Sequence, residues 1–591
     1  MKNFLIYTLA TIAGIILSSI LFFVILLSSL SALVASGEKT IAISDNSVLV
    51  LKAGVNIPDR GNSNPWSGFD PVNFTFTSTP GLNEILTNIR KAAKDERIKG
   101  ILIENGLMAP GWATSEEIRN ALIRFRASGK FVIAWSDYLL NQEGYFLSTA
   151  ADKIYLNPQA VIEYRGLSGE VMFYKKALDK IGVDVQVIRH GKFKGAVEPY
   201  ILDRLSDENR LQIKDYVGSI WKYAVSVISK ARNIPEEKLM KIADDLTATD
   251  PRGALANNMI DGIMYRDALI DTLKTRSGVS LSDKIQLVAM SKYSKVYLAD
   301  KTRKLSSGNR IALIFAEGTI VTGGGLDDNI GGNAYAELIR EQRKDTNVKA
   351  IVLRVNSPGG SAAASDIMWR ELDLASKVKP VVVSMGNYAA SGGYYISAPA
   401  TRIYASQVTI SGSIGVFGLL PEAGKLLHDK LGIATENVST NAHSDFPSVF
   451  RPLSVFEKDV MQRNIERTYG EFVERVAAGR RMTEANVDSI GQGRVWTGEK
   501  AMKLGLIDTI GGLYDAIRGA AKLAGLSDYS VREYPLTLDP YTRILSSLSG
   551  EIKSGILKTE LGENYRIFRQ LKEITGMTGT QAMLPYIIEI H

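Results

Sequence analysis

The sequence has no cysteine and only four histidines among its 591 residues. The lack of cysteine excludes disulfides, cysteine nucleophiles and thiolate metal sites. No two histidines form an H-x-x-x-H or H-E-x-x-H pair, so we expect no metal site and no cofactor. The net charge of +7 is small for this length, and no basic cluster is interleaved with aromatic residues. We therefore expect no binding to nucleic acid.

Charge is absent from residues 3–37, a stretch rich in Leu, Ile and Phe that is long enough to cross a bilayer as a helix. A cleaved secretory signal is the alternative, with a small-residue cleavage site at 32–35. The apolar run is longer than the apolar region of a signal, which favours an uncleaved anchor over residues 1–37. Lys2 precedes the run and predicts a cytoplasmic N-terminus with the bulk of the chain outside, although Lys39 at the other end weakens this bias.

The rest of the chain contains an internal repeat, in which three blocks of the first half recur about 250 residues later, in the same order. The matched blocks are Lys94–Glu104 with Lys344–Arg354, Ser148–Tyr155 with Ser397–Tyr404, and Gly253–Asp261 with Lys500–Asp508. A nearly constant offset indicates a tandem duplication. The sequence thus predicts a first repeat at 38–300, a second repeat at 301–535 and a helical tail at 536–591.

Within each repeat, short apolar strands alternate with amphipathic helices. In the second repeat we expect a strand at 350–355, a helix at 362–375, a strand at 381–385 and then another helix. This alternation is typical of parallel βαβ units and predicts an α/β fold.

Ser391 follows the expected strand at 381–385 and stands where the next helix should begin, after Gly386 has broken the strand. Free backbone N–H groups and the positive end of a helix dipole surround a hydroxyl at that position. Such a place suits a nucleophile whose reaction creates an oxyanion. An ordinary helix cap is the alternative for an isolated Ser-Gly-Gly.

The turn Asn356–Ser361, Asn-Ser-Pro-Gly-Gly-Ser, follows the preceding strand. Because parallel strands end at the same edge of a sheet, this turn and Ser391 should lie side by side. Backbone N–H groups of Gly360 and Gly392 are then candidate oxyanion donors. A phosphate loop is not indicated, because the chain has no G-x-x-x-x-G-K-[ST] motif.

A serine nucleophile needs a base, and the sequence offers Lys194, its neighbour Lys192, and His443 in a polar loop. Comparison of the repeats favours Lys194. The first repeat has no serine at the position matching Ser391, and the second repeat has Ser444 opposite Lys194. Each repeat holds what the other lacks, which indicates one composite site.

Five motifs together resemble the signal peptide peptidase A family, the long-form protease IV, over nearly all of residues 40–535. They are Gly-Lys-Phe-Lys at 191–194, Ser-Pro-Gly-Gly at 357–360, Tyr-Ala-Ala-Ser-Gly-Gly-Tyr-Tyr-Ile at 388–396, Gly-Ser-Ile-Gly at 412–415 and Gly-Arg-Val-Trp-Thr-Gly-Glu-Lys-Ala at 493–501. The resemblance implies a tandem duplication of a ββα superhelix domain like that of caseinolytic proteases and crotonases, behind an N-terminal transmembrane helix.

The resemblance also implies a Ser-Lys dyad. The nucleophile matches Ser391, the general base Lys194, a hydroxyl that hydrogen-bonds the lysine Ser413, and the oxyanion donors Gly360 and Gly392. It implies a peptidase that degrades cleaved signal peptides and other apolar peptides. Its expected setting is the bacterial inner membrane, as a single-pass protein with its bulk on the extracytoplasmic side, and as a homo-oligomer, usually a tetramer.

A lysine base must be neutral, so Lys194 should be buried under apolar surface from the other repeat or a neighbouring subunit. Glu198, four residues on, should not pair with it, because a carboxylate would raise the pKa of the lysine. Two alternatives stay open: a crotonase-like acyl-CoA enzyme, which needs no serine nucleophile, and a non-catalytic membrane scaffold.

Overall fold

The computed structural model describes residues 42–61, 80–107, 109–296, 308–324, 329–536 and 580–584, with a few short pieces between and before them. The predicted anchor over residues 1–37 and the predicted tail over 536–591 lie for the most part outside the described residues. Among the residues that are described, no helix combines the length and the apolar character needed to cross a membrane.

The first repeat is built on six parallel strands in the order β10-β7-β5-β4-β1-β11. Their bounds are β1 Ser47–Lys52, β4 Ile98–Asn105, β5 Phe131–Ser136, β7 Lys153–Leu156, β10 Gly262–Ile263 and β11 Leu287–Ala289. The central strands are continuous apolar runs, as expected where helices cover both faces of a parallel sheet.

The second repeat has the same strand order. Its strands are β12 Arg310–Glu317, β15 Val348–Ser357, β17 Val381–Ala390, β18 Arg402–Ala405, β19 Ile410–Gly412, β21 Val495–Thr497, β22 Thr509–Ile510 and β23 Ser530–Tyr534. The series β23-β12-β15-β17-β18-β22 corresponds to β11-β1-β4-β5-β7-β10 of the first repeat. The two sheets therefore agree with the duplication expected from the sequence.

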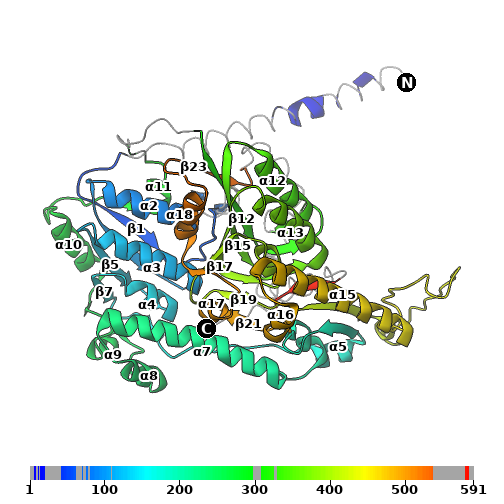
Figure 1. Ribbon diagram of the computed structural model, residues 1–591. Helices are drawn as coiled ribbons and strands as arrows, with labels where there is room; N and C mark the ends of the chain where they lie inside the picture. Colours follow the sequence, from blue (N-terminus) through cyan, green and yellow to red (C-terminus); the bar gives the residue numbers. More distant parts are fainter. Residues whose placement is uncertain are drawn as a thin grey trace.

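The helices also recur in pairs. They are α2 Leu82–Lys94 with α12 Gly332–Lys344, α3 Trp112–Arg126 with α13 Ala362–Ser376, α4 Gln142–Ser148 with α14 Gly392–Ser397, α7 Asp207–Arg232 with α15 Val455–Arg480, α8 Glu236–Asp244 with α16 Glu484–Ile490, α9 Pro251–Ala256 with α17 Gly498–Lys503, and α10 Arg266–Ser277 with α18 Leu513–Leu523. Figure 1 shows the repeats side by side, with α18 beside α2 of the first repeat. Tyr514 of α18 hydrogen-bonds Thr87 of α2.

The strand that precedes Ser391 is longer than the sequence predicts. We expected Gly386 to end it, but β17 continues to Ala390. The register explains the difference, because Val355 faces Met385 while Ser357 already faces Ala389. Residues 386–388 thus form a bulge, and beyond it β17 exchanges β18 for β19 as its neighbour. A glycine in a strand often marks such a bulge rather than an end.

A third sheet joins the two repeats. Its order is β14 Asn329–Gly331, β13 Thr319–Val321, β16 Gly359–Ser361, β24 Gln581–Met583, β20 Val416–Glu422 and β9 Asp184–His190. The strand β9 comes from the first repeat and pairs antiparallel with β20 of the second along its full length. The loop after β9, which contains Lys194, is thereby held against the second repeat.

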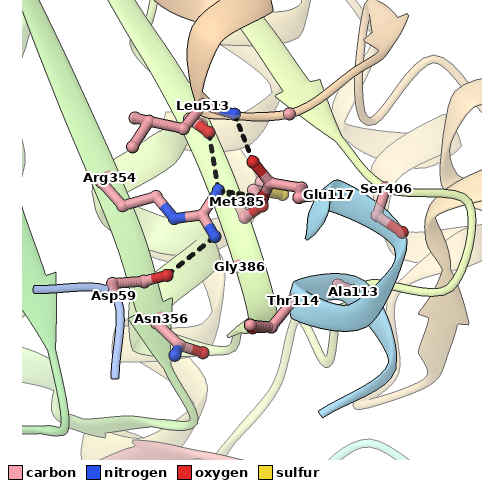
Figure 2. Close-up of polar contacts among 12 residues, drawn as sticks. Asp59, Ala113, Thr114, Glu117, Arg354, Asn356, Met385, Gly386, Ser406 and Leu513 are labelled. Atoms are coloured by element: carbon pink, nitrogen blue, oxygen red, sulfur yellow. Dashed lines mark hydrogen bonds and ion pairs between the residues drawn. The ribbon is translucent and has the colours of Figure 1, made fainter. Parts of the chain in front are cut away.

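A buried ionic cluster also joins the repeats. The side chain of Arg354, on β15, is fully buried and donates from Nη2 to Asp59 Oδ1 at 2.7 Å and from Nη1 to Glu117 Oε1 at 2.7 Å. Both carboxylates belong to the first repeat. Figure 2 shows the guanidinium between Asp59 and Glu117, with Glu117 also accepting from the N–H of Leu513. Removal of one partner from such a cluster leaves a buried charge uncompensated.

We expect the substitution Arg354→Met to lower the free energy of unfolding by about 3 to 5 kcal/mol, because two buried carboxylates lose their cation. Urea unfolding followed by circular dichroism measures the change. The triple variant Arg354→Met, Asp59→Asn, Glu117→Gln should lose less than the single variant, because it removes the charges together.

The matched control is Arg370→Met. Arg370 forms an exposed ion pair with Asp373 on α13, so its loss should cost less than about 1 kcal/mol. Equal effects of the two arginine substitutions would show that the buried cluster does not stabilise the junction of the repeats.

Candidate active site

Ser391 lies between β17 and α14 in a strained backbone conformation, with φ 54° and ψ −114°. A positive φ at a residue other than glycine is uncommon and clusters at functional sites. Its N–H donates to the carbonyl of Gly412 at 2.8 Å, which holds the turn. The hydroxyl does not cap α14, although Ser391 occupies the cap position. The helix-cap alternative is therefore wrong for this side chain.

The hydroxyl of Ser391 meets the amine of Lys194 instead. Lys194 Nζ lies 2.8 Å from Ser391 Oγ, and it also lies within hydrogen-bond distance of Ser413, 3.0 Å from Oγ and 3.2 Å from the carbonyl oxygen. All three side chains are fully buried. The structure thus brings together three residues that the sequence singled out, one from the first repeat and two from the second.

Glycines of the second repeat make room for the lysine. A Cβ on Gly493, whose φ is +78°, would lie 2.7 Å from the backbone nitrogen of Lys194. A Cβ on Gly415 would lie 3.3 Å from Lys194 Cδ. Phe193 donates its N–H to the carbonyl of Gln492 at 2.9 Å, which fixes the lysine loop between these glycines. Two of the motif glycines therefore serve the close approach of the two repeats.

Burial lowers the pKa of Lys194 well below its usual value of 10.5. No carboxylate opposes this effect. Glu198 is buried, but it accepts from Ser206 and from Asn209 Nδ2, and it lies 3.6 Å from Arg189. The expectation that Glu198 does not pair with Lys194 agrees with this geometry. A neutral amine beside a serine hydroxyl can take its proton.

The two glycine turns lie side by side, as the sequence predicts. Ser357, at the end of β15, faces Ala389 of β17, and a Cβ on Gly359 would lie 2.7 Å from the backbone nitrogen of Gly392. Gly359 has a φ of +99° that favours glycine, and a Cβ on Gly360 would meet the carbonyl of Ile320 at 2.0 Å. The two turns that contain the candidate donors Gly360 and Gly392 thus lie in contact, next to Ser391.

Sequence reasoning missed one element of the site, the strand β24. It lies antiparallel to β16, with Gly360 opposite Ala582, and it contacts β20 on its other side. The carbonyl oxygen of Ala582 would be 2.2 Å from a Cβ on Gly359 and 3.0 Å from one on Gly392. A short apolar segment in a tail that matches no motif gives no signal by which the sequence could reveal this placement.

Two alternative bases lie elsewhere. His443 bonds Glu457 Oε1 at 3.1 Å and stacks on Phe456, both at the start of α15. Lys192 is exposed, with its amine over the ring of Phe193. Within the described part of the chain, no three His, Asp or Glu side chains gather in a way that could hold a metal ion.

Comparison with known proteins gives the family. The model of peptidase family S49 matches residues 124–280 and 373–527, so Lys194 falls in the first match and Ser391 in the second. Protease 4 of Haemophilus influenzae is 32% identical over 551 residues, which cover 90% of this chain and 88% of that protein. Protease 4 of Salmonella typhi is 36% identical over 486 residues, or 80% and 77% of the two chains.

The chloroplastic serine protease SPPA of Arabidopsis thaliana is 32% identical over 529 residues, covering 88% of this chain and 76% of that protein. Among solved structures, a variant of a membrane-bound stomatin-specific protease in complex with a substrate peptide matches 41% of this chain and 100% of its own, at 15% identity and a TM-score of 0.27. From the shared sequence over most of its length, the chain belongs to peptidase family S49 and is a serine peptidase.

Proposed function

We propose that this serine peptidase works through a Ser-Lys dyad and degrades apolar peptides, cleaved signal peptides among them. The observation that carries the proposal is the 2.8 Å contact between Lys194 Nζ and Ser391 Oγ. Both groups are buried, and each comes from a different repeat. No carboxylate pairs with the lysine, so nothing of that kind stabilises its charged form. A pair of this kind has the nucleophile and the activating base that acyl transfer requires.

In the proposed mechanism, neutral Lys194 takes the proton of Ser391 as Oγ attacks the scissile carbonyl carbon. The N–H groups of Gly360 and Gly392 stabilise the oxyanion, and the ammonium of Lys194 then gives its proton to the leaving amine. Water, deprotonated by Lys194, hydrolyses the acyl-enzyme. Ser413 acts through Lys194: its two oxygens accept from Nζ and hold the amine toward Ser391.

The form of the substrate follows from the way in which β24 lies between β16 and β20. The backbones of these strands bind an extended segment between them, since β24 pairs with both. An extended peptide can add to such strands by main-chain hydrogen bonds, and pockets for its side chains then set the preference. The buried apolar residues Ala582 and Leu584 support a preference for apolar peptides.

The proposed setting is the bacterial inner membrane, with the bulk of the chain on the extracytoplasmic side. Its supports are the uncharged run at residues 3–37 and the family resemblance, which also implies a homo-oligomer, usually a tetramer. A crotonase-like acyl-CoA enzyme is disfavoured, because it has no use for a buried lysine in contact with the hydroxyl of Ser391.

We expect Lys194→Met to lower kcat/KM by about 10²- to 10⁴-fold, because the nucleophile loses its base while the buried aliphatic stem is kept. Hydrolysis of a fluorogenic apolar peptide by the detergent-solubilised protein measures the change. Lys192→Met is the matched control and should leave turnover unchanged, because Lys192 is exposed. Loss of activity in His443→Ala with retention in Lys194→Met would contradict the dyad.

The pH profile of kcat/KM should report Lys194. Because the neutral amine is the active form and burial lowers its pKa, activity should rise with pH through a value well below 10.5. Ser413→Ala removes an acceptor that favours the ammonium form, so the acid limb should move to lower pH while kcat falls. If the acid limb of the pH profile is unchanged in Ser413→Ala, the hydroxyl of Ser413 does not affect the pKa of Lys194.

A further inference from the structure

The C-terminal strand β24 lies between β16 and β20 in a defined register. Beyond the pairs within the strand, Ala362 donates its N–H to the carbonyl of Thr580 at 3.2 Å, and Leu584 donates to the carbonyl of Pro358 at 2.6 Å. These contacts continue the ladder on both sides of the Gly360–Ala582 pair. The strand therefore passes the catalytic turn as an extended peptide, antiparallel to β16.

The register presents one peptide bond to the site. The carbonyl oxygen of Ala582 packs against the backbone of Gly359 and Gly392, the two turns that contain the oxyanion donors. The neighbouring residues Gln581 and Met583 point to the other face of the strand, because side chains alternate. The carbonyl next to Ser391 is thus that of Ala582, and the bond that follows it joins Ala582 to Met583.

The side chain of Met583 contacts an apolar cluster that the two repeats build together. Val197 of the first repeat and Phe417 and Leu419 of β20 form its buried centre, with Tyr200 and Ile201 packed against it. Val197 ends a short 3-10 helix, Gly195–Val197, and Tyr200 and Ile201 lie in α6, Glu198–Ile201. These two helices directly follow Lys194 in the chain.

We infer that β24 is bound as a substrate, that Ser391 cuts between Ala582 and Met583, and that the apolar subsite of Val197, Tyr200, Ile201 and Phe417 selects the residue after the cut. The inference rests on the proposed function and deepens it. The residue on the leaving side of the bond should be a long apolar one such as Met or Leu. The buried position of Ala582 leaves room for a small residue before the bond.

The reaction at this bond balances as an ordinary peptide hydrolysis. Ser391 Oγ bonds to the carbonyl carbon of Ala582, the bond from that carbon to the nitrogen of Met583 breaks, and the amine leaves with the proton carried by Lys194. Water then releases a chain that ends at Ala582. The other product is the peptide Met583–His591.

The subsite and the base lie on one continuous segment, which has a consequence for catalysis. A side chain that fills the subsite packs against the cluster that contains Val197, three residues after Lys194. Filling the subsite should therefore steady the lysine loop as well as bind the peptide. The residue after the cut should change kcat in addition to KM.

The first experiment is the intact mass of the full-length protein after incubation in detergent, wild type beside Ser391→Ala. We expect the wild type to lose Met583–His591 and Ser391→Ala to keep it. A wild type that hydrolyses an added apolar peptide but keeps its tail, or cuts the tail at another bond, would overturn the assigned register and leave the proposed peptidase standing. A wild type that hydrolyses neither would contradict the proposed function itself.

The second experiment tests the subsite with peptides that differ only in the residue after an Ala. We expect kcat/KM to be about tenfold or more higher for Met than for Asp at that position. Ile201→Lys should reduce the ratio of kcat/KM for Met to kcat/KM for Asp, because the lysine favours Asp. A loss of folding would lower kcat/KM for both peptides and would not change their ratio in this way. Ile181→Lys, at an exposed apolar position on α5 (Lys175–Ile181), is the control and should keep the ratio. An unchanged ratio in Ile201→Lys would refute the subsite.

Discussion

The contact between Lys194 and Ser391 spans the two repeats, and the rest of the structure serves to hold it. The lysine loop carries few residues, so its position depends on what lies on either side. On one side, β9 pairs with β20 over seven residues. On the other, the loop is clamped against Gly415 and Gly493 of the second repeat. A shift of β9 against β20 would move the amine away from a hydroxyl that has no other base within the described part of the chain.

The ionic cluster around Arg354 joins the two repeats at a second place, on β15 and β17. Arg354 lies on β15, three residues before the Ser-Pro-Gly-Gly turn, and it also donates to the hydroxyl of Ser384 on β17. Its carboxylate partners fix both strands to the first repeat. Burial and the nearby Asp59 raise the pKa of Glu317, at the edge of the cluster, to about 8, so it is protonated at neutral pH. One guanidinium then faces two carboxylates rather than three, which limits the charge buried at the junction.

The sequence predicted the parts of the fold and site that depend on local pattern or on the duplication. Three features could be predicted from the residues alone. They are the alternation of strands and helices, the serine at a strand-to-helix turn, and the presence of the serine in one repeat and of the lysine in the other. The bulge at Gly386 was not, because a bulge depends on which strand lies beside β17 at each point. Arg354 matches Glu104 in the alignment of the repeats, but its ion pairs with Asp59 and Glu117 could not be predicted, because they depend on how the repeats pack together. The placement of β24 depends on β16 and β20, two strands of the second repeat that lie on either side of it only in the folded chain.

A neutral Lys194 requires the two repeats to be in close contact, because that contact buries its amine. At neutral pH the unfolded chain carries Lys194 protonated, whereas burial in the folded protein favours the free amine. Folding therefore releases a proton from Lys194 at pH values between the lowered pKa and the usual one, and this term lowers stability increasingly as the pH falls through that range. The first repeat contains the amine, and residues of the second repeat such as Gly415 and Gly493 bury it. Separation of the base and the nucleophile between two repeats lets the docking of the repeats provide the desolvation, and the free energy of that docking offsets its cost.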